Sequence, residues 1–266
     1  MKNQPYYKNE NVVIYNKDSC VMPEVENNSI GLVVTSPPYW DLKNYKSNGQ
    51  IGLGQSYEEY LEKLAVILKE CKRALIPGRY FAIVIGTRVS DGELKHIPLD
   101  IIKIFEKIGM ILKKEFIWLK PKGTQGLWQR GTTQFLKKKP YPGAVNINIQ
   151  HEFIHLFQKE GEFKTIDGDR LSEEFIKEVA WSVWKLPVSK QKGHPAPFPY
   201  SIPERLIKLY SCRTETILDP FMGSGTTALT AINLGRKCIG YELSEDYCQL
   251  AKNNILMPKN EKLFDR

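Results

Sequence analysis

The sequence predicts an α/β fold in which helices pack on both faces of a doubly wound, parallel β-sheet. Apolar, β-branched runs that suit buried strands alternate with segments whose apolar residues recur every three or four positions, as in amphipathic helices. A glycine-rich turn lies between one such strand and the helix that follows it. With 266 residues, the chain is long enough for one large domain of this kind with a modest insertion.

The first two strands are expected to bring polar residues to one edge of the sheet. Residues 11–15 form an apolar run that ends before Asp18, and residues 30–34 form a second run that ends before Thr35. In open α/β sheets, ligands bind outside the carboxyl ends of the strands. We therefore expect Asp18 and the segment that begins at Thr35 to face a ligand. The polar, glycine-containing stretch 41–55 is expected to be a loop.

Helices and strands then alternate up to residue 119. The expected elements are a helix over 57–75 that stops at Pro77 and Gly78, a strand over 80–85, a helix that opens at Pro98 and ends at Gly109, and a strand over 111–119. This alternation is the pattern of a parallel sheet with crossover helices.

The pattern breaks between residues 123 and 192. Residues 123–143 are rich in Gly, Thr, Gln, Lys and aromatic residues and match no regular element. Strict alternation then returns, and five apolar residues share one face of a strand: Val145, Ile147, Ile149, Phe153 and Phe157. The polar segment 161–192 contains a short helix-like patch, and a short helix opened by Pro203 restores the regular pattern.

The last third reads as strand, glycine turn, helix and strand. The strand covers 216–219, the helix covers 228–234, and the final strand covers 237–242. Glu242 ends this strand about 20 positions after the glycines of the turn, where an acidic side chain can accept hydrogen bonds from ribose hydroxyl groups.

Composition narrows the class of protein. The formal charge of +8 and the pI near 9.1 are compatible with a polyanionic partner. The five cysteines are scattered without a Cys-x-x-Cys pair, as is usual in a reducing cytosol. The sequence shows no apolar signal segment and no run of the ~18 apolar residues that a membrane span needs. We therefore expect a soluble, cytoplasmic protein.

The segment Thr35-Ser36-Pro37-Pro38-Tyr39-Trp40 has the composition of a ring-binding turn. Each proline fixes φ and has no N–H, so the turn is stiff and its carbonyl groups are left as acceptors. A hydroxyl group, rigid carbonyls and aromatic faces can together hold a flat, amino-bearing ring by hydrogen bonding and stacking. The alternative interpretation is a proline turn that only closes a strand.

The turn Asp219-Pro220-Phe221-Met222-Gly223-Ser224-Gly225-Thr226-Thr227 indicates a cofactor site. It lacks the third glycine of the dinucleotide fingerprint and the Gly-Lys-Ser/Thr of a phosphate loop, which disfavours nicotinamide cofactors and ATP. Asp219, at the mouth of the turn, would repel a pyrophosphate and attract a cationic, amino-bearing ligand, which favours S-adenosylmethionine. The alternative is an ordinary pair of loop glycines, and the presence of Glu242 and Asp18 weighs against it.

Two further motifs each allow two interpretations. The stretch from His151 to His155 matches the zinc-protease pattern His-Glu-x-x-His, but that pattern requires a helix and this copy lies in a strand-like segment, so no metal is expected. The stretch from His194 to Pro199 is either a plain linker or, through Phe198, one wall of a cofactor pocket.

The irregular segment carries a basic and aromatic cluster. It contains Trp128, Arg130, Lys137, Lys138 and Lys139, and Tyr141 follows them closely in the sequence. A lysine run is most often a solvated face, but the neighbouring aromatic residues favour a contact with nucleic acid.

Taken together, these motifs resemble the beta group of S-adenosylmethionine-dependent amino DNA methyltransferases. The segment 35–40 is similar to the Ser-Pro-Pro-Tyr catalytic motif, and the segment 219–225 is similar to the Asp-Pro-Phe-x-Gly-x-Gly cofactor motif. The catalytic motif comes first, which marks the beta group, whose Rossmann-like sheet is circularly permuted. The resemblance covers nearly the whole chain.

The resemblance implies a role for each matching residue. Catalysis is assigned to Ser36, Pro37, Pro38 and Tyr39. Cofactor binding is assigned to Asp18 at the adenine, Glu242 at the ribose, and Thr35, Phe198, Asp219, Pro220, Phe221, Gly223, Gly225, Thr226 and Thr227. The implied organisation is a catalytic part over 1–122, a target-recognition insertion over 123–192 with a core strand near 145–158, and a cofactor-binding part over 193–266.

Ser36 decides the expected base. In the family, Asp or Asn at this position is usual for adenine N6 and Ser for cytosine N4, so we expect N4 of cytosine in double-stranded DNA, with adenine N6 as the alternative. Cytosine C5 is disfavoured because the chain has no Pro-Cys pair to supply the nucleophile.

A less favoured alternative is methylation of a protein glutamine amide, which related Pro-Pro-Tyr enzymes perform. A cognate restriction endonuclease and a monomeric or homodimeric state are further expectations.

The implied mechanism is direct transfer to a flipped base. The amino nitrogen is conjugated and lies inside the duplex, so the base must first leave the stack at a cost of a few kcal/mol. Stacking on Tyr39, worth about 1–3 kcal/mol per base, offsets part of this cost. The Ser36 hydroxyl and the Pro37 carbonyl would then accept hydrogen bonds from the amino group.

Overall fold

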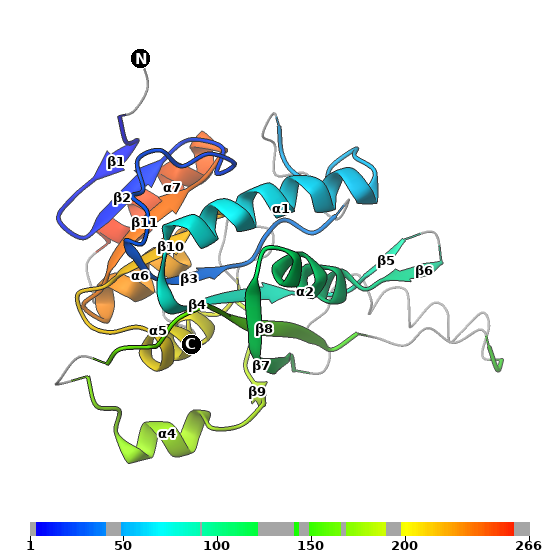
Figure 1. Cartoon of the computed structure of the whole chain (residues 1–266). Coiled ribbons are helices and arrows are strands. Elements are labelled where there is room, and N and C mark those ends of the chain that lie inside the picture. Colours follow the sequence, from blue (N-terminus) through cyan, green and yellow to red (C-terminus); the bar gives the residue numbers. More distant parts are fainter. Residues whose placement is uncertain are drawn as a thin grey trace.

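The computed structural model describes residues 4–40, 49–90, 92–121, 141–143, 149–165, 169–189 and 198–257. In this part of the chain, nine strands form one sheet, whose order is β1-β2-β11-β10-β3-β4-β8-β7-β9 (Figure 1). In that order, the strands are β1 (Tyr7–Lys8), β2 (Val12–Tyr15), β11 (Lys237–Tyr241), β10 (Thr216–Asp219), β3 (Ile30–Thr35), β4 (Leu75–Ile85), β8 (His151–Lys159), β7 (Met110–Leu119) and β9 (Val183–Lys185). A separate hairpin consists of β5 (Arg88–Ser90) and β6 (Glu93–Lys95).

The prediction of a doubly wound, parallel sheet is confirmed for its central strands, but antiparallel strands extend the sheet on both sides. The five strands from β2 to β4 run parallel to one another. The strand β8 runs antiparallel to both of its neighbours, β4 and β7, and β1 runs antiparallel to β2. Alternation in the sequence identifies a strand but carries no information about its direction, and β8 follows an irregular segment rather than a crossover helix.

Helices cover both faces of the sheet, as the doubly wound pattern predicts. One apolar cluster contains residues of α1 (Tyr57–Ala74) and α2 (Ile97–Lys107). The other contains residues of α5 (Ser201–Tyr210), α6 (Thr226–Asn233) and α7 (Glu245–Leu256). A short helix, α4 (Glu173–Val179), lies at the periphery, at the bottom of Figure 1. Burial of strands on both faces is what the long apolar runs of the sequence require.

Side chains form hydrogen bonds with the backbone at both ends of α1. Ser56 accepts a hydrogen bond from the Glu59 N–H, and the Glu59 carboxylate accepts one from the Ser56 N–H, which makes a capping box. At the other end, the Lys159 ammonium of β8 donates to the carbonyl oxygens of Lys72 and Leu75. The helix therefore has partners from outside its own backbone at both ends.

The strand after α1 starts earlier than predicted. Pro77 and Gly78 are expected to separate a helix from a strand, yet β4 begins at Leu75 and includes both. Gly78 has a φ of +81° and the register between β3 and β4 shifts near Leu32, so the start of the strand is irregular. A proline and a glycine are tolerated there because the ladder is interrupted.

The strand β8 is buried on both faces rather than one. Phe153 and Phe157 share a face, as predicted, and the His155 ring lies between theirs. Ile154 and Leu156 on the opposite face are also buried, in the cluster under α5 and α6. Of the residues predicted for this face, Val145 and Ile147 lie outside the described part of the chain.

The following elements were not predicted from the sequence: the strand β1, the β5–β6 hairpin, the strand β9 and the last helix, α7. The five cysteines are all free. None of the helices within the described residues has the length and apolar content needed to span a bilayer.

Candidate active site

The topology brings four predicted site residues to one edge of the sheet. Thr35 is the last residue of β3 and Asp219 is the last residue of β10, while Glu242 directly follows β11 and Asp18 follows β2. These strands are parallel neighbours in the sheet, so their carboxyl ends lie side by side. The edge predicted to bind a ligand therefore exists and carries three carboxyl groups.

A buried hydrogen bond joins the two motifs. The Thr35 hydroxyl donates to Asp219 Oδ1 at 2.6 Å, across 184 positions of sequence. The same oxygen accepts from the Phe221 N–H at 3.1 Å, so one carboxylate holds the start of both turns. Asp219 is only 1% exposed, which corrects the expectation that it stands at the mouth of the glycine turn. It lies beneath the edge and fixes the two turns relative to each other.

Burial also changes the acidity of Asp219. Desolvation raises its pKa from an ordinary 3.8 to about 6, against the opposing effect of hydrogen bonds from the Thr35 hydroxyl and the Phe221 N–H. Between those two values, the folded chain binds a proton that the unfolded chain releases. The contribution of this group to stability is therefore present at low pH and is lost as the pH rises through about 6.

We predict that Asp219→Asn stabilises the cofactor-free protein in a pH-dependent way. The amide oxygen can still accept from Thr35, but no buried charge forms. The free energy of unfolding of the variant should exceed that of the wild type by on the order of 2–3 kcal/mol at about pH 8, and by little at about pH 4. Denaturant titrations at the two pH values measure this difference. An equal difference at both would contradict the assigned cause.

The glycine turn needs its glycines for conformation and space. Gly223 and Gly225 have φ values of +51° and +83°, in the left-handed region. A Cβ on Gly225 would lie 2.9 Å from the Cβ of Ala251 in α7, so α7 packs closely on the turn. The Gly225 N–H donates to the Met222 carbonyl at 2.9 Å, and α6 starts directly after it. The turn thus places the start of α6, including Thr226 and Thr227, at the edge of the sheet.

Glu242 is bonded to this turn. One carboxylate oxygen accepts from the Gly223 N–H at 2.9 Å and the other accepts from the Ser244 N–H at 2.8 Å. Burial raises the pKa of Glu242, and these two N–H donors oppose that shift. The side chain is thereby fixed in orientation at the place where the sequence predicts a ribose contact.

Asp18 lies on a segment held against the same edge. The Asn16 amide donates to the carbonyl oxygens of Glu242 and Leu243, at 3.0 and 2.9 Å, which ties the ends of β2 and β11 together. The Asp18 carboxylate accepts from the Cys20 N–H at 2.8 Å and is exposed to solvent. An exposed, oriented carboxylate can accept from an amino group of a ligand.

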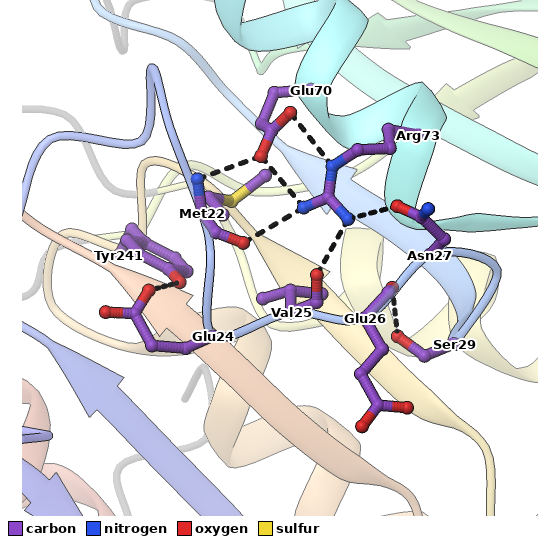
Figure 2. Close-up of polar contacts among 9 residues, drawn as sticks. All are labelled: Met22, Glu24, Val25, Glu26, Asn27, Ser29, Glu70, Arg73 and Tyr241. Carbon is purple, nitrogen blue, oxygen red and sulfur yellow. Dashed lines mark hydrogen bonds and ion pairs between the residues drawn. The ribbon is translucent and has the colours of Figure 1, made fainter. Parts of the chain in front are cut away.

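An arginine of α1 clamps the rest of this segment (Figure 2). The Arg73 guanidinium donates to both oxygens of Glu70 and to the carbonyl oxygens of Met22 and Val25, at 2.8–3.0 Å. It also donates to Asn27 Oδ1 at 2.6 Å. Glu70 in turn accepts from the Met22 N–H at 2.9 Å. The connection between β2 and β3 is therefore fixed mainly by side chains of α1.

We expect Arg73→Ala to lower the free energy of unfolding by about 1–3 kcal/mol, because it leaves two carbonyl groups without their donor and leaves Glu70 with the Met22 N–H but no cationic partner. Chemical denaturation measures the change. The matched control is Arg213→Ala, which removes an ion pair between Asp169 and a side chain that is 73% exposed. That control should cost less than about 0.5 kcal/mol. Equal losses of stability in the two variants would show that the hydrogen bonds of Arg73 contribute no more than an exposed ion pair.

The catalytic segment leaves β3 as a supported turn. The Tyr60 hydroxyl of α1 donates to the Pro38 carbonyl at 3.0 Å, so this carbonyl is occupied, contrary to the expectation that the proline carbonyls are all left as acceptors. The Trp40 indole N–H donates to the Gln55 carbonyl at 2.9 Å. Pro37 is buried, whereas Ser36 and Tyr39 are partly exposed. The turn is therefore anchored behind Ser36 and Tyr39.

Sequence reasoning missed two residues next to Tyr39. The Tyr39 hydroxyl donates to Glu152 Oε2 at 2.7 Å, and Lys120 forms an ion pair with the other oxygen of Glu152. Glu152 belongs to the His-Glu-x-x-His stretch, which lies on β8, so the prediction of a strand is confirmed. Residues four apart on a strand are separated by about 13 Å, too far for His151 and His155 to share one zinc ion.

The structure describes only some of the remaining predicted site residues. Pro220 and Phe221 begin the glycine turn, and Phe221 packs against the cluster under α1. Phe198 lies just before α5 and packs against the opposite cluster. The residues predicted to contact DNA, Trp128, Arg130, Lys137, Lys138 and Lys139, lie outside the described residues.

The doubly wound sheet, the acidic glycine turn and the rigid Ser-Pro-Pro-Tyr turn at one edge define a Rossmann-like methyltransferase that acts on amino groups. The chain belongs to the DNA methylase family that covers N6 and N4 methylation, whose model matches residues 30–253.

Similar proteins agree with this membership. The type II methyltransferase M.MjaI of Methanocaldococcus jannaschii is 32% identical over 90% of this chain and 89% of its own. The type II methyltransferase M.BglII of Bacillus subtilis is 30% identical over 90% of this chain and 67% of its own.

Solved structures agree on the fold. TTHA0409 of Thermus thermophilus, crystallised with S-adenosyl-L-methionine, is 29% identical with a TM-score of 0.70, over 91% of this chain and 93% of its own. PvuII DNA methyltransferase, described as cytosine-N4-specific, has a TM-score of 0.75 at 22% identity, over 96% of this chain and 90% of its own. The latter likeness concerns the fold alone.

Proposed function

We propose that this DNA methylase transfers a methyl group from S-adenosylmethionine to the exocyclic N4 amino group of a cytosine flipped out of duplex DNA. The observation that carries the choice of base is Ser36, which presents a hydroxyl where adenine-modifying relatives usually present a carboxyl or amide side chain. The placement of Ser36 at the end of β3, next to the edge that carries Asp219 and Glu242, supports a common site for base and cofactor.

The residues of the edge fit S-adenosylmethionine. The cofactor supplies an electrophilic methyl group on a positively charged sulfonium. The carboxyl groups of Asp18 and Glu242 suit a cationic, amino-bearing molecule and would repel a pyrophosphate, while the buried Asp219 joins the two turns beneath them. Backbone N–H groups orient all three carboxylates: Cys20 donates to Asp18, Phe221 donates to Asp219, and Gly223 and Ser244 donate to Glu242. Asp18 would hold the adenine end and Glu242 the ribose.

The catalytic turn would orient the base. Flipping costs a few kcal/mol, and stacking on Tyr39 offsets about 1–3 kcal/mol of it. The Ser36 hydroxyl and the Pro37 carbonyl accept hydrogen bonds from the amino group, since the Pro38 carbonyl already accepts from Tyr60. These bonds draw the nitrogen lone pair out of conjugation with the ring. The lone pair would form the bond to the methyl carbon as the carbon–sulfur bond of the sulfonium breaks, which leaves a neutral thioether, and the nitrogen would lose one proton to solvent.

Adenine N6 is the alternative base, because the family model covers both reactions. The match to a DNA methylase family favours DNA over a protein amide as the acceptor. Because the relatives described above are type II methyltransferases, we further propose a cognate restriction endonuclease as partner. The segment 123–192 remains our proposed target-recognition region, although it also contributes β8 and β9 to the sheet.

The base can be identified from cells that express the protein. Their DNA is digested to nucleosides and analysed by mass spectrometry, with cells that express Ser36→Ala as the comparison. We expect N4-methylcytosine in the first sample and at least about tenfold less in the second, because the hydroxyl acceptor is lost. If N6-methyladenine alone appears, the adenine alternative is correct and the assignment based on Ser36 is wrong.

A further inference from the structure

We propose that Glu152 is a positioning residue that holds the ring of Tyr39 in the orientation in which it stacks on the target base. This inference rests on the proposed function of Tyr39 as the stacking residue. It assigns a role to a carboxyl group that belongs to neither the catalytic turn nor the cofactor turn.

The direction of β8 brings Glu152 to the active edge. Because β8 runs antiparallel to β4, its first residues lie beside the last residues of β4, and Phe153 pairs with Ile85. Glu152 therefore lies next to Gly86, at the edge where β3 delivers the catalytic turn. From there its Oε2 accepts from the Tyr39 hydroxyl at 2.7 Å.

Gly86 leaves the space that this contact occupies. A Cβ at this position would lie 3.2 Å from Cγ of Glu152 and 3.4 Å from Cε2 of the Tyr39 ring. The first distance is shorter than ordinary van der Waals contact and the second is at its lower limit. A larger residue would therefore push the two side chains aside. Tyr39 and Glu152 thus meet over the only kind of residue that lacks a side chain.

Glu152 is itself held in place. Lys120 forms an ion pair with Oε1, and the side chains of the pair are only 17% and 15% exposed. Lys120 is in turn fixed by its backbone N–H, which donates to the Gln150 carbonyl at 2.8 Å, and its ammonium lies 4.6 Å from the centre of the Trp118 ring. With one oxygen occupied by Lys120, the other is directed to Tyr39.

The Tyr39 ring is consequently supported at both of its ends. The backbone before it is fixed by the bond between Tyr60 and the Pro38 carbonyl, and the hydroxyl end is fixed by Glu152. A ring that is already ordered loses less freedom when a base stacks on it, which favours the flipped state. Glu152 acts through Tyr39 and need not touch the base.

A double-mutant cycle tests the inference. The variants are Tyr39→Phe, which keeps the ring and removes the hydroxyl, Glu152→Leu, and the two combined. Tritiated methyl transfer to unmethylated bacterial genomic DNA is measured at saturating S-adenosylmethionine. We expect each single variant to lower kcat about tenfold and the double variant to be no slower than the worse single variant, within about twofold. Glu152→Gln keeps one oxygen that can accept from Tyr39 but loses the acceptor of Lys120, so its kcat should lie between that of Glu152→Leu and that of the wild type.

Two results would overturn the inference. One is an additive loss, in which Glu152→Leu slows the Tyr39→Phe protein by the same factor as the wild type. The other is an unchanged kcat in Tyr39→Phe, which also decides the matter if Glu152→Leu fails to fold. Glu115→Gln, on the neighbouring strand and in contact with His155, is the control and should leave kcat unchanged. Failure of the proposed function would appear separately, as absence of methyl transfer by the wild type.

Discussion

Tyr39→Ala should lower the rate of methyl transfer to DNA by about 10- to 150-fold. The substitution removes the ring on which the flipped base stacks, and stacking is worth about 1–3 kcal/mol per base. Loss of the hydroxyl also removes the bond to Glu152. The affinity for S-adenosylmethionine should stay within about twofold of the wild type, because the carboxylates assigned to the cofactor are at the ends of β2, β10 and β11 rather than on the catalytic turn.

Tritium transfer to unmethylated DNA and calorimetry with S-adenosylmethionine measure the two quantities. Tyr7→Ala is the matched control, since Tyr7 lies on β1 at the far edge of the sheet. It should leave the rate within about twofold. Wild-type rates in Tyr39→Ala would remove Tyr39 from the proposed mechanism.

Asp219→Ala should weaken S-adenosylmethionine binding by at least about 30-fold. The buried carboxylate accepts from both Thr35 and the Phe221 backbone, and a buried donor left without an acceptor costs about 1–3 kcal/mol. The two turns would shift relative to each other to find new partners. The cofactor needs both turns in their wild-type arrangement, so the free energy required to restore that arrangement on binding lowers the affinity.

Asp219→Asn is the comparison, since its amide oxygen can keep the bond to Thr35. It should bind the cofactor more tightly than Asp219→Ala but more weakly than the wild type, because the negative charge is gone. Calorimetry on the three proteins gives the order. If Asp219→Ala bound S-adenosylmethionine as the wild type does, the buried bond would have no part in building the site.

The sequence was sufficient for the features that depend on chain order and strand ends. Once β3 and β10 are assigned as parallel strands, Thr35 and Asp219 have to end at the same edge, even though they are far apart in the chain. The glycine turn could also be predicted from the sequence, because Gly223 and Gly225 adopt a conformation that other residues rarely take. Family resemblance added the roles of these residues, which geometry alone does not supply.

Features that depend on tertiary packing could not be read from the sequence. Nothing local marks β8 as antiparallel, so Glu152 could not be placed beside Tyr39. Tyr60 lies on the buried face of α1, and no local pattern indicates that its hydroxyl donates to the Pro38 carbonyl. Asp219 was expected at the mouth of the glycine turn, and only the packed structure shows that it is buried and that its pKa is raised.

One measurement tests the central claim most directly. The purified protein is incubated with unmethylated double-stranded DNA and S-adenosylmethionine that carries a deuterated methyl group, and the DNA is then digested for mass spectrometry of its nucleosides. Direct transfer to cytosine N4 predicts a cytidine nucleoside that carries the intact labelled methyl group on its exocyclic nitrogen. A label found only on adenine N6 or on cytosine C5, or no label in DNA at all, would contradict the account.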